Sequence, residues 1–205
     1  MAKGADLRKV RPVQTFDELR CSGPDLAPYA LGEPIYVYDR IAHLGTLDPV
    51  HVTHRGTNVH ITRFVATPFV KAGKRNVDPL VLLELIAFIS ERFDAVQTVS
   101  FSLRSEVASY EDGMKIASAR SALLQRIGAH GVTISPQPDS AAPGNFVVHG
   151  VWIYNERNLA TLGQCLQRER AIYRDSEAAA GRETARQGLR DRFRRWLWGD
   201  GGLVD

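Results

Sequence analysis

Cysteine is nearly absent from this chain, since Cys21 and Cys165 are the only two among 205 residues. They lie far apart and form no CxxC or CxxH motif, which excludes a disulfide framework and a zinc-finger signature. A reducing, cytoplasmic location is therefore expected.

Long apolar runs are also missing. The N-terminus "MAKGADLRKVRPVQTFDELR" is charged, and no stretch approaches the ~18 apolar residues of a membrane span. With 44% apolar composition the chain can still bury a substantial core. We expect a soluble protein with an N-terminal segment (1–32), an α/β core (33–155) and a C-terminal helical extension (156–205).

The net positive charge is concentrated in one segment. The formal net charge is +3, and residues 182–198 alone hold six arginines against two acidic residues, a local excess of +4. The rest of the chain is close to neutral, which is not the uniformly basic surface of a nucleic-acid-binding protein. We therefore expect no nucleic-acid partner.

Period-two and period-3.6 patterns predict the secondary structure. Residues 33–44 indicate a first strand, and alternation over 49–70 around "RGTN" predicts a β-hairpin. Asp78 as N-cap and Pro79 predict the start of a helix that is apolar on nearly every side. A strand over 95–105, a helix over 111–131 ended by Gly128, two closing strands and terminal helices follow. This order predicts an α+β fold with a mixed central sheet flanked by helices.

Two segments carry a family resemblance: "HITRFVATP" at residues 60–68 and the stretch from residue 123 to 162 that begins "LLQRIGAHG". With the element order, they resemble the GNAT superfamily of N-acetyltransferases, and most of all its acyl-homoserine-lactone synthase branch. Thr62-Arg63-Phe64 is similar to the end of that branch's Glu-x-Ser-Arg-Phe segment, although His60 stands where the glutamate would be. The resemblance implies an acetyltransferase-like domain, with Arg63 in the active site.

The same resemblance implies an acyl-CoA or acyl carrier protein thioester as co-substrate and a small-molecule amine as acceptor. Backbone amides at Phe64 and Val65 would polarise the thioester carbonyl. The loop "KAGKRNVDP" (71–79) would bind the carrier's phosphates through Gly73 and its basic neighbours, Lys71, Lys74 and Arg75. The second glycine of the family loop is absent, so a plain strand-to-helix corner remains the alternative.

Other residues have both a catalytic and a structural interpretation. Glu84, in an apolar helix, is a general base for an amine, a buried carboxylate with a partner such as an arginine, or a partly exposed side chain. Tyr154 is either a general acid for the departing thiolate or part of a packed strand end. His51 and His60, with His43 and His54, are the residue type of a zinc site, but alternating polar residues on a strand favour a solvated face. We expect no metal.

The segment 183–198 predicts a basic amphipathic helix. Its apolar stripe comprises Leu189, Phe193, Trp196 and Leu197, and Arg190, Arg194 and Arg195 flank it. Such a helix packs on its own domain, pairs with a second copy in a homodimer, docks into a partner protein or lies on an anionic membrane.

Two functions follow from these patterns. The first is acyl transfer from a thioester to an amine, and a splayed cleft beside residues 64–75 would favour it. The second is a non-catalytic binding or regulatory module that acts through the C-terminal helix. Arg63 falls on the apolar face of its strand with Val59 and Ile61, so we also expect a carboxylate partner for it, with Glu84 as the candidate.

Overall fold

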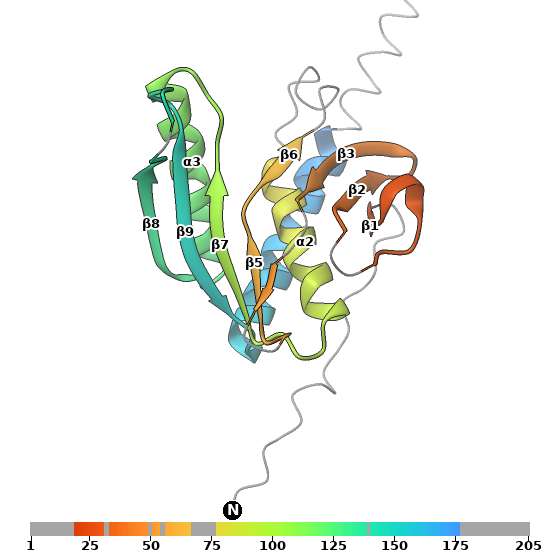
Figure 1. The fold of residues 1–205 in the computed structure, drawn as a ribbon. Coiled ribbons are helices and arrows are strands. Elements are labelled where there is room, and N and C mark those ends of the chain that lie inside the picture. Colours follow the sequence, from red (N-terminus) through yellow and green to blue (C-terminus); the bar gives the residue numbers. More distant parts are fainter. Residues whose placement is uncertain are drawn as a thin grey trace, which may run out of the picture.

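The computed structural model describes residues 19–30, 33–48, 51–53, 56–66, 77–138 and 140–176. It consists of two β-sheets with helices packed against them (Figure 1). The expected fold class, a mixed sheet flanked by helices, is confirmed, although the strands divide between two sheets. None of the helices in these residues is long and apolar enough to cross a membrane.

The smaller sheet is antiparallel and has the strand order β1-β2-β3-β6. The single strand expected over 33–44 is wrong, because the chain turns between Asp39 and Ala42 and forms two strands. Arg40 holds the left-handed conformation of that turn, with φ at 54°. The strands are β1 (Leu19–Ser22), β2 (Ile35–Asp39), β3 (Ala42–Leu47) and β6 (Phe64–Ala66).

The larger sheet is mixed and has the order β4-β5-β7-β9-β8. The predicted hairpin is confirmed, since β4 pairs antiparallel with β5 and places His51 opposite His60. β5 then runs parallel to β7, and β7, β9 and β8 pair antiparallel. The strands are β4 (His51–Thr53), β5 (Asn58–Ile61), β7 (Thr98–Arg104), β8 (His130–Pro136) and β9 (Phe146–Ile153).

The helix α2 (Asp78–Arg92) is the centre of the hydrophobic core. Val77 is its N-cap residue, so the prediction of Asp78 as N-cap is wrong by one position. Its predicted burial is confirmed. The helix is buried along most of its length because its apolar side chains point in every direction. The buried residues are Leu80, Val81, Leu82, Leu83, Glu84, Leu85, Ile86, Ala87, Ile89 and Ser90.

The helix α3 (Tyr110–Arg126) packs on β8 and β9. Its N-cap Ser109 accepts a hydrogen bond from the Asp112 N–H, and Gly128 follows its end with φ at +87°. The predicted glycine stop is therefore confirmed, and Trp152 fixes this corner by donating from Nε1 to the Ile127 carbonyl.

A C-terminal helix spans residues 156–176, up to the end of the described chain. Leu162, Leu166 and Tyr173 place one face of it in the same hydrophobic cluster as the two sheets. Arg170 on that face donates two hydrogen bonds to the Glu84 carboxylate of α2, from Nε at 2.6 Å and from Nη2 at 2.8 Å. The buried arginine partner expected for Glu84 is thus confirmed. The amphipathic segment 183–198 lies outside the described residues.

Candidate active site

The chain crosses from one sheet to the other at residues 62–64. β5 is paired with β7 up to Ile61, and the Arg104 N–H donates to the Thr62 carbonyl at 3.2 Å. The next strand, β6, is paired with β3 alone among the described strands. The two sheets therefore separate just before Phe64.

The backbone of β6 turns hydrogen-bond donors toward this separation. Asp48 of the β3 side donates to the Arg63 carbonyl at 3.1 Å, so Asp48 and Arg63 form a hydrogen-bonded antiparallel pair. Such pairs alternate with non-bonded ones. Leu47 and Phe64 are the next pair in register and belong to the non-bonded class. The N–H of Phe64 accordingly points away from β3, toward the side where no described strand is paired with β6.

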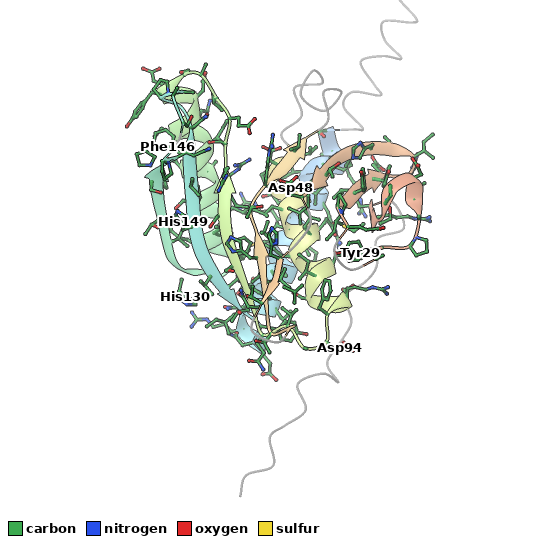
Figure 2. All side chains as sticks on the ribbon, in the orientation of Figure 1. Tyr29, Asp48, Asp94, His130, Phe146 and His149 are labelled. Atoms are coloured by element: carbon green, nitrogen blue, oxygen red, sulfur yellow. The ribbon has the colours of Figure 1, made fainter. Side chains whose placement is uncertain are left out.

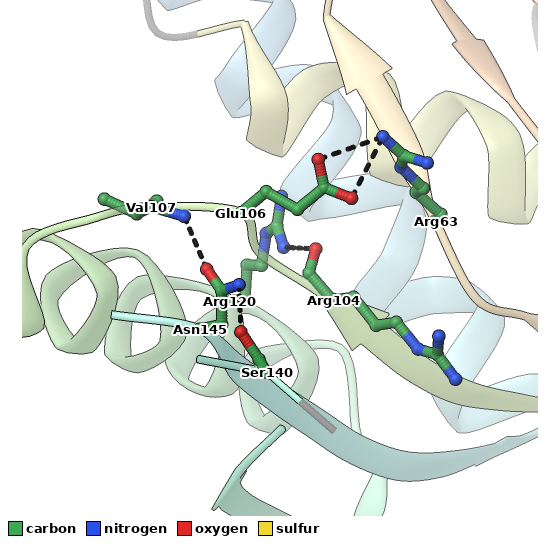
Figure 3. Close-up of polar contacts among 7 residues, drawn as sticks. All are labelled: Arg63, Arg104, Glu106, Val107, Arg120, Ser140 and Asn145. Carbon is green, nitrogen blue, oxygen red and sulfur yellow. Dashed lines mark hydrogen bonds and ion pairs between the residues drawn. The ribbon is translucent and has the colours of Figure 1, made fainter. Parts of the chain in front are cut away.

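An ion pair spans the same opening (Figure 3). Arg63 Nη2 lies 3.1 Å from Glu106 Oε1 and 3.2 Å from Oε2. A carboxylate partner for Arg63 is therefore confirmed, but the expectation that it is Glu84 is wrong. Regular pairing stops at Thr62, so the Arg63 side chain leaves the apolar face and is 43% exposed, whereas Glu84 is held in the core by Arg170.

Hydrogen bonds of the Asn145 side chain hold the loop that carries Glu106 in place. Asn145 Oδ1 accepts from the Val107 N–H at 2.6 Å, and its Nδ2 donates to Ser140 Oγ at 2.6 Å (Figure 3). The Ser105 N–H donates to the Phe146 carbonyl at 3.1 Å. These bonds draw the chain after β7 toward β9 and away from β6, which keeps the two strand ends apart.

A cavity of about 100 Å³ lies between the first turn of α2 and the middle of α3. Its wall is mostly aliphatic, and Asp78 and Arg120 supply its charges. Arg120 Nη1 donates to the Arg104 carbonyl at 2.7 Å (Figure 3). Burial lowers the pKa of Arg120, and the nearby Asp78 carboxylate opposes that shift. The lining residues are Asp78, Pro79, Leu82, Leu103, Ile116, Ala119, Arg120 and Leu123.

The first turn of α2 closes one end of this cavity. Its N-cap Val77 makes no side-chain capping bond. The first N–H groups of a helix have no partner within the helix and carry a partial positive charge. The cavity is thus bordered by the positive end of the helix and by the Arg120 cation, but also by the Asp78 carboxylate and by Pro79, which has no N–H to donate.

The sequence-predicted site residues fall in three places. Phe64 and Val65 border the opening between the sheets, next to Arg63. Tyr154 lies at the far end of β7, because its N–H donates to the Gln97 carbonyl, about 20 Å along the strand from Arg104. Glu84 lies in the core. The loop residues Lys71, Gly73, Lys74 and Arg75 are outside the described residues, as are Leu189, Phe193, Arg194, Trp196 and Leu197.

Sequence reasoning overlooked Arg104, Glu106 and Arg120. The signal was present in "LRSE", where an apolar alternating strand ends in two charged residues, a common position for site residues on a sheet edge. Arg120 gave no signal, since one arginine on a helix resembles any solvated one.

The face of the five-stranded sheet turned away from the helices is polar. The helices pack on the apolar face of Val99, Phe101 and Leu103 (Figure 1). The opposite face carries half-buried polar side chains joined across four strands, and no described helix covers it. Figure 2 labels one of them, His149 of β9. The residues so joined are Asn58, His60, Thr98, Ser100, Ser102, Ser135 and His149.

The histidines do not gather into a metal site in the described part of the chain. No group of three or more His, Cys, Asp or Glu side chains there is placed to hold a metal ion. His43 lies on the smaller sheet and bonds to the Gly45 carbonyl and the Thr46 hydroxyl.

No family model and no curated protein matches this sequence. Among solved structures, a nourseothricin acetyltransferase matches with a TM-score of 0.38 and 9% identity, covering 66% of this chain and 83% of its own. Arabidopsis thaliana Naa50, solved with a bisubstrate analogue, matches with a TM-score of 0.35 and 11% identity, covering 59% and 72%. Both TM-scores lie below 0.5, so neither protein's activity transfers to this chain.

Proposed function

We propose that the protein transfers an acyl group from a phosphopantetheine thioester, carried by coenzyme A or an acyl carrier protein, to a small-molecule amine. The observation that supports this most directly is the edge of β6. There an N–H donor at Phe64 points into an opening between two sheets, beside an apolar cavity with a cationic rim.

The cavity suits the carrier. A phosphopantetheine arm is a thin, mostly aliphatic chain that ends in phosphate. Leu82, Leu103 and Leu123 offer it an apolar wall, while Arg120 offers a partner for phosphate oxygens. The basic loop 71–75 directly precedes α2 in sequence, and we propose that it adds further contacts to the carrier.

The acyl transfer depends mainly on positioning the amine and the thioester against each other. The neutral amine attacks the thioester carbonyl carbon, and the Phe64 N–H stabilises the negative charge that develops on the carbonyl oxygen. The C–N bond forms, the C–S bond breaks, and the thiolate leaves with a proton from the amine nitrogen. The Arg63–Glu106 ion pair holds the strand ends on either side of the reacting group.

Carrier binding tests the proposal. Calorimetry with acetyl-CoA should show binding to the full chain. Ala119→Phe, which places a ring in the cavity from the exposed side of α3, should weaken that binding by at least tenfold. Ser118→Phe is the matched control, since Ser118 is exposed on the same helix but does not line the cavity.

Arg120→Gln should also weaken acetyl-CoA binding, whereas Arg126→Gln should not. Arg126 lies later on α3 and faces Glu169 at 3.7 Å. If acetyl-CoA and an acyl carrier protein thioester both fail to bind, the proposal is wrong. Equal loss of binding in Ala119→Phe and Ser118→Phe would remove the cavity from it.

A further inference from the structure

We propose that the acceptor amine carries an oxyanion, either a carboxylate or a phosphate, and that Arg104 at the end of β7 binds it. This inference rests on the proposed acyl transfer and adds a substrate class to it. Arg104 holds the part of the acceptor that does not react.

Arg104 lies across the opening from the Phe64 amide. The parallel register of β5 and β7 pairs Ile61 with Phe101. Three residues further along both strands, the same register sets Phe64 opposite Arg104, where the strands have separated. An acceptor whose nitrogen attacks a carbonyl held at Phe64 is therefore within reach of the Arg104 side chain.

The Arg104 side chain belongs to the open polar face. Burial alternates along β7, so that Leu103 lies in the core while Ser102 and Arg104 face the other way. The ladder with β9 continues through Arg104, which pairs with Val147, so the alternation holds up to this residue. Arg104 is exposed. It is therefore available to a ligand that approaches from the side away from the helices.

The guanidinium of Arg104 has no hydrogen-bond or ion-pair partner among the described residues. Glu106, the nearest carboxylate along the chain, is engaged by Arg63, and Figure 3 shows the Arg104 side chain pointing away from that pair. Arg120, the third arginine at this edge, donates to the Arg104 carbonyl. The N–H donors of Arg104 thus remain available to a ligand.

The main chain of Arg104 is held on both sides. Its N–H donates to the Thr62 carbonyl at 3.2 Å, and its carbonyl accepts from Arg120 Nη1 at 2.7 Å. The side chain therefore extends from a fixed backbone, and less conformational freedom is lost when it binds a ligand.

The sheet around Arg104 favours a negative charge. Its five strands, all of them within the described residues, contain no aspartate or glutamate. Their ionisable side chains are all basic. An anion on the polar face is therefore attracted by Arg104 and meets no carboxylate of the sheet. The ionisable residues of these strands are His51, His60, Arg104, His130 and His149.

A guanidinium selects an oxyanion over other polar groups. Its planar fork of N–H donors matches two oxygens of a carboxylate or a phosphate, and such charge-assisted bonds are about twice as strong as neutral ones. The ammonium end of the acceptor is repelled by Arg104 and lies at the other end of the molecule. Binding of the oxyanion therefore turns the acceptor nitrogen toward the thioester.

Two acceptors of similar length test the role of the anion. β-Alanine carries a carboxylate where 3-aminopropan-1-ol carries an uncharged hydroxymethyl group. With acetyl-CoA as donor, the unchanged protein should use β-alanine with a kcat/KM at least about tenfold higher. The difference should lie mainly in KM, because the ion pair is present in the ground state and in the transition state. The pair 2-aminoethyl phosphate and ethanolamine makes the same comparison for phosphate and shows which oxyanion is preferred.

Arg104→Gln should remove this preference. It should lower kcat/KM for the preferred anionic acceptor by about tenfold or more and leave the neutral acceptors within about threefold. Arg104→Lys should keep part of the preference, since the charge remains and the fork is lost. Arg126→Gln is the matched control, because Arg126 lies on α3 beside Glu169, and it should change neither value. Equal use of anionic and neutral acceptors by the unchanged protein, or equal losses for both in Arg104→Gln, would overturn the inference.

NMR of the arginine side chains provides a readout that does not depend on turnover. In the full chain without acetyl-CoA, β-alanine or 2-aminoethyl phosphate should shift the Arg104 Nε–H signal, whereas the neutral acceptors should not. The absence of a shift with both anions would overturn the inference. Calorimetry with acetyl-CoA separates the two proposals: a shifted Arg104 signal in a protein that does not bind acetyl-CoA would support the anion site and contradict the acyl transfer.

Discussion

At the scale of single residues, the two ion pairs that involve predicted site residues differ in environment. The side chains of Arg170 and Glu84 are 8% and 10% exposed and meet through two short bonds, whereas Arg63 and Glu106 are 43% and 65% exposed. A buried charge that loses its partner is far more costly than an exposed one.

We therefore expect Arg170→Met to lower the free energy of unfolding by about 3–5 kcal/mol, because it leaves the Glu84 carboxylate charged and unpaired in the core. The double variant Arg170→Met/Glu84→Leu should recover part of this loss. Glu106→Gln, the exposed counterpart, should cost at most about 1 kcal/mol. Urea unfolding at pH 7.5 measures all three, and equal costs for Arg170→Met and Glu106→Gln would contradict this account.

His60 should also make the free energy of unfolding depend on pH. Its pKa in the folded protein lies below the ordinary value of 6.5, so the unfolded chain binds more protons once the pH falls through that value. The stability tied to the neutral ring is present above pH 6.5 and is lost as the pH falls toward the folded pKa. His60→Gln should therefore lose less stability than the unchanged protein between pH 7.5 and 5.5. Parallel urea-unfolding profiles would show that the folded and unfolded pKa values are the same.

At the scale of elements, alternating and helical patterns predicted most of the larger sheet, α2 and α3, because each has one clear apolar face or is buried all round. The turn at Arg40 was missed because a left-handed turn normally carries Asn or Gly, and arginine gives no such signal. β1 is short and half-buried, so its pattern is weak. The site was harder to predict because Arg63 and Glu106 are 43 residues apart and meet only where two sheets diverge.

Two glycines in helices should respond oppositely to the same substitution. A Cβ on Gly113 of α3 would lie 1.8 Å from the Gly144 carbonyl oxygen, in the loop that supports Asn145, whereas a Cβ on Gly163 of the C-terminal helix meets nothing within 4 Å. Gly113→Ala should cost ~1–3 kcal/mol by forcing the loop away. Gly163→Ala should stabilise by ~0.4–1 kcal/mol, because alanine restricts the unfolded chain. Thermal and urea unfolding measure the sign of each change in the free energy of unfolding. A stabilised Gly113→Ala would show that the Gly144 loop moves away at little cost.

At the scale of the whole molecule, the helices gather on one side of the larger sheet and the polar face is on the other. The cavity lies between α2 and α3, whereas His60 lies on the open polar face. In the proposed reaction, the carrier therefore enters from the helical side and the acceptor from the polar side. In that proposal, the two substrates meet at the Phe64 amide.

The C-terminal helix should decide whether this architecture forms. Residues 156–176 contribute Leu162, Leu166 and Tyr173 to the core, and Tyr173 also donates a hydrogen bond to Asp39 of β2. A chain truncated after Tyr154 loses these contacts and the partner of Glu84. We expect it to show no cooperative urea transition and no dispersed amide NMR spectrum. A chain truncated after Ser176 retains every core contact described above and should unfold cooperatively. The slope of its unfolding free energy against urea concentration should be unchanged. A folded product from the shorter truncation would mean that the two sheets and α2 close a core without this helix. Failure of the longer one to fold would mean that residues 177–205 complete the core.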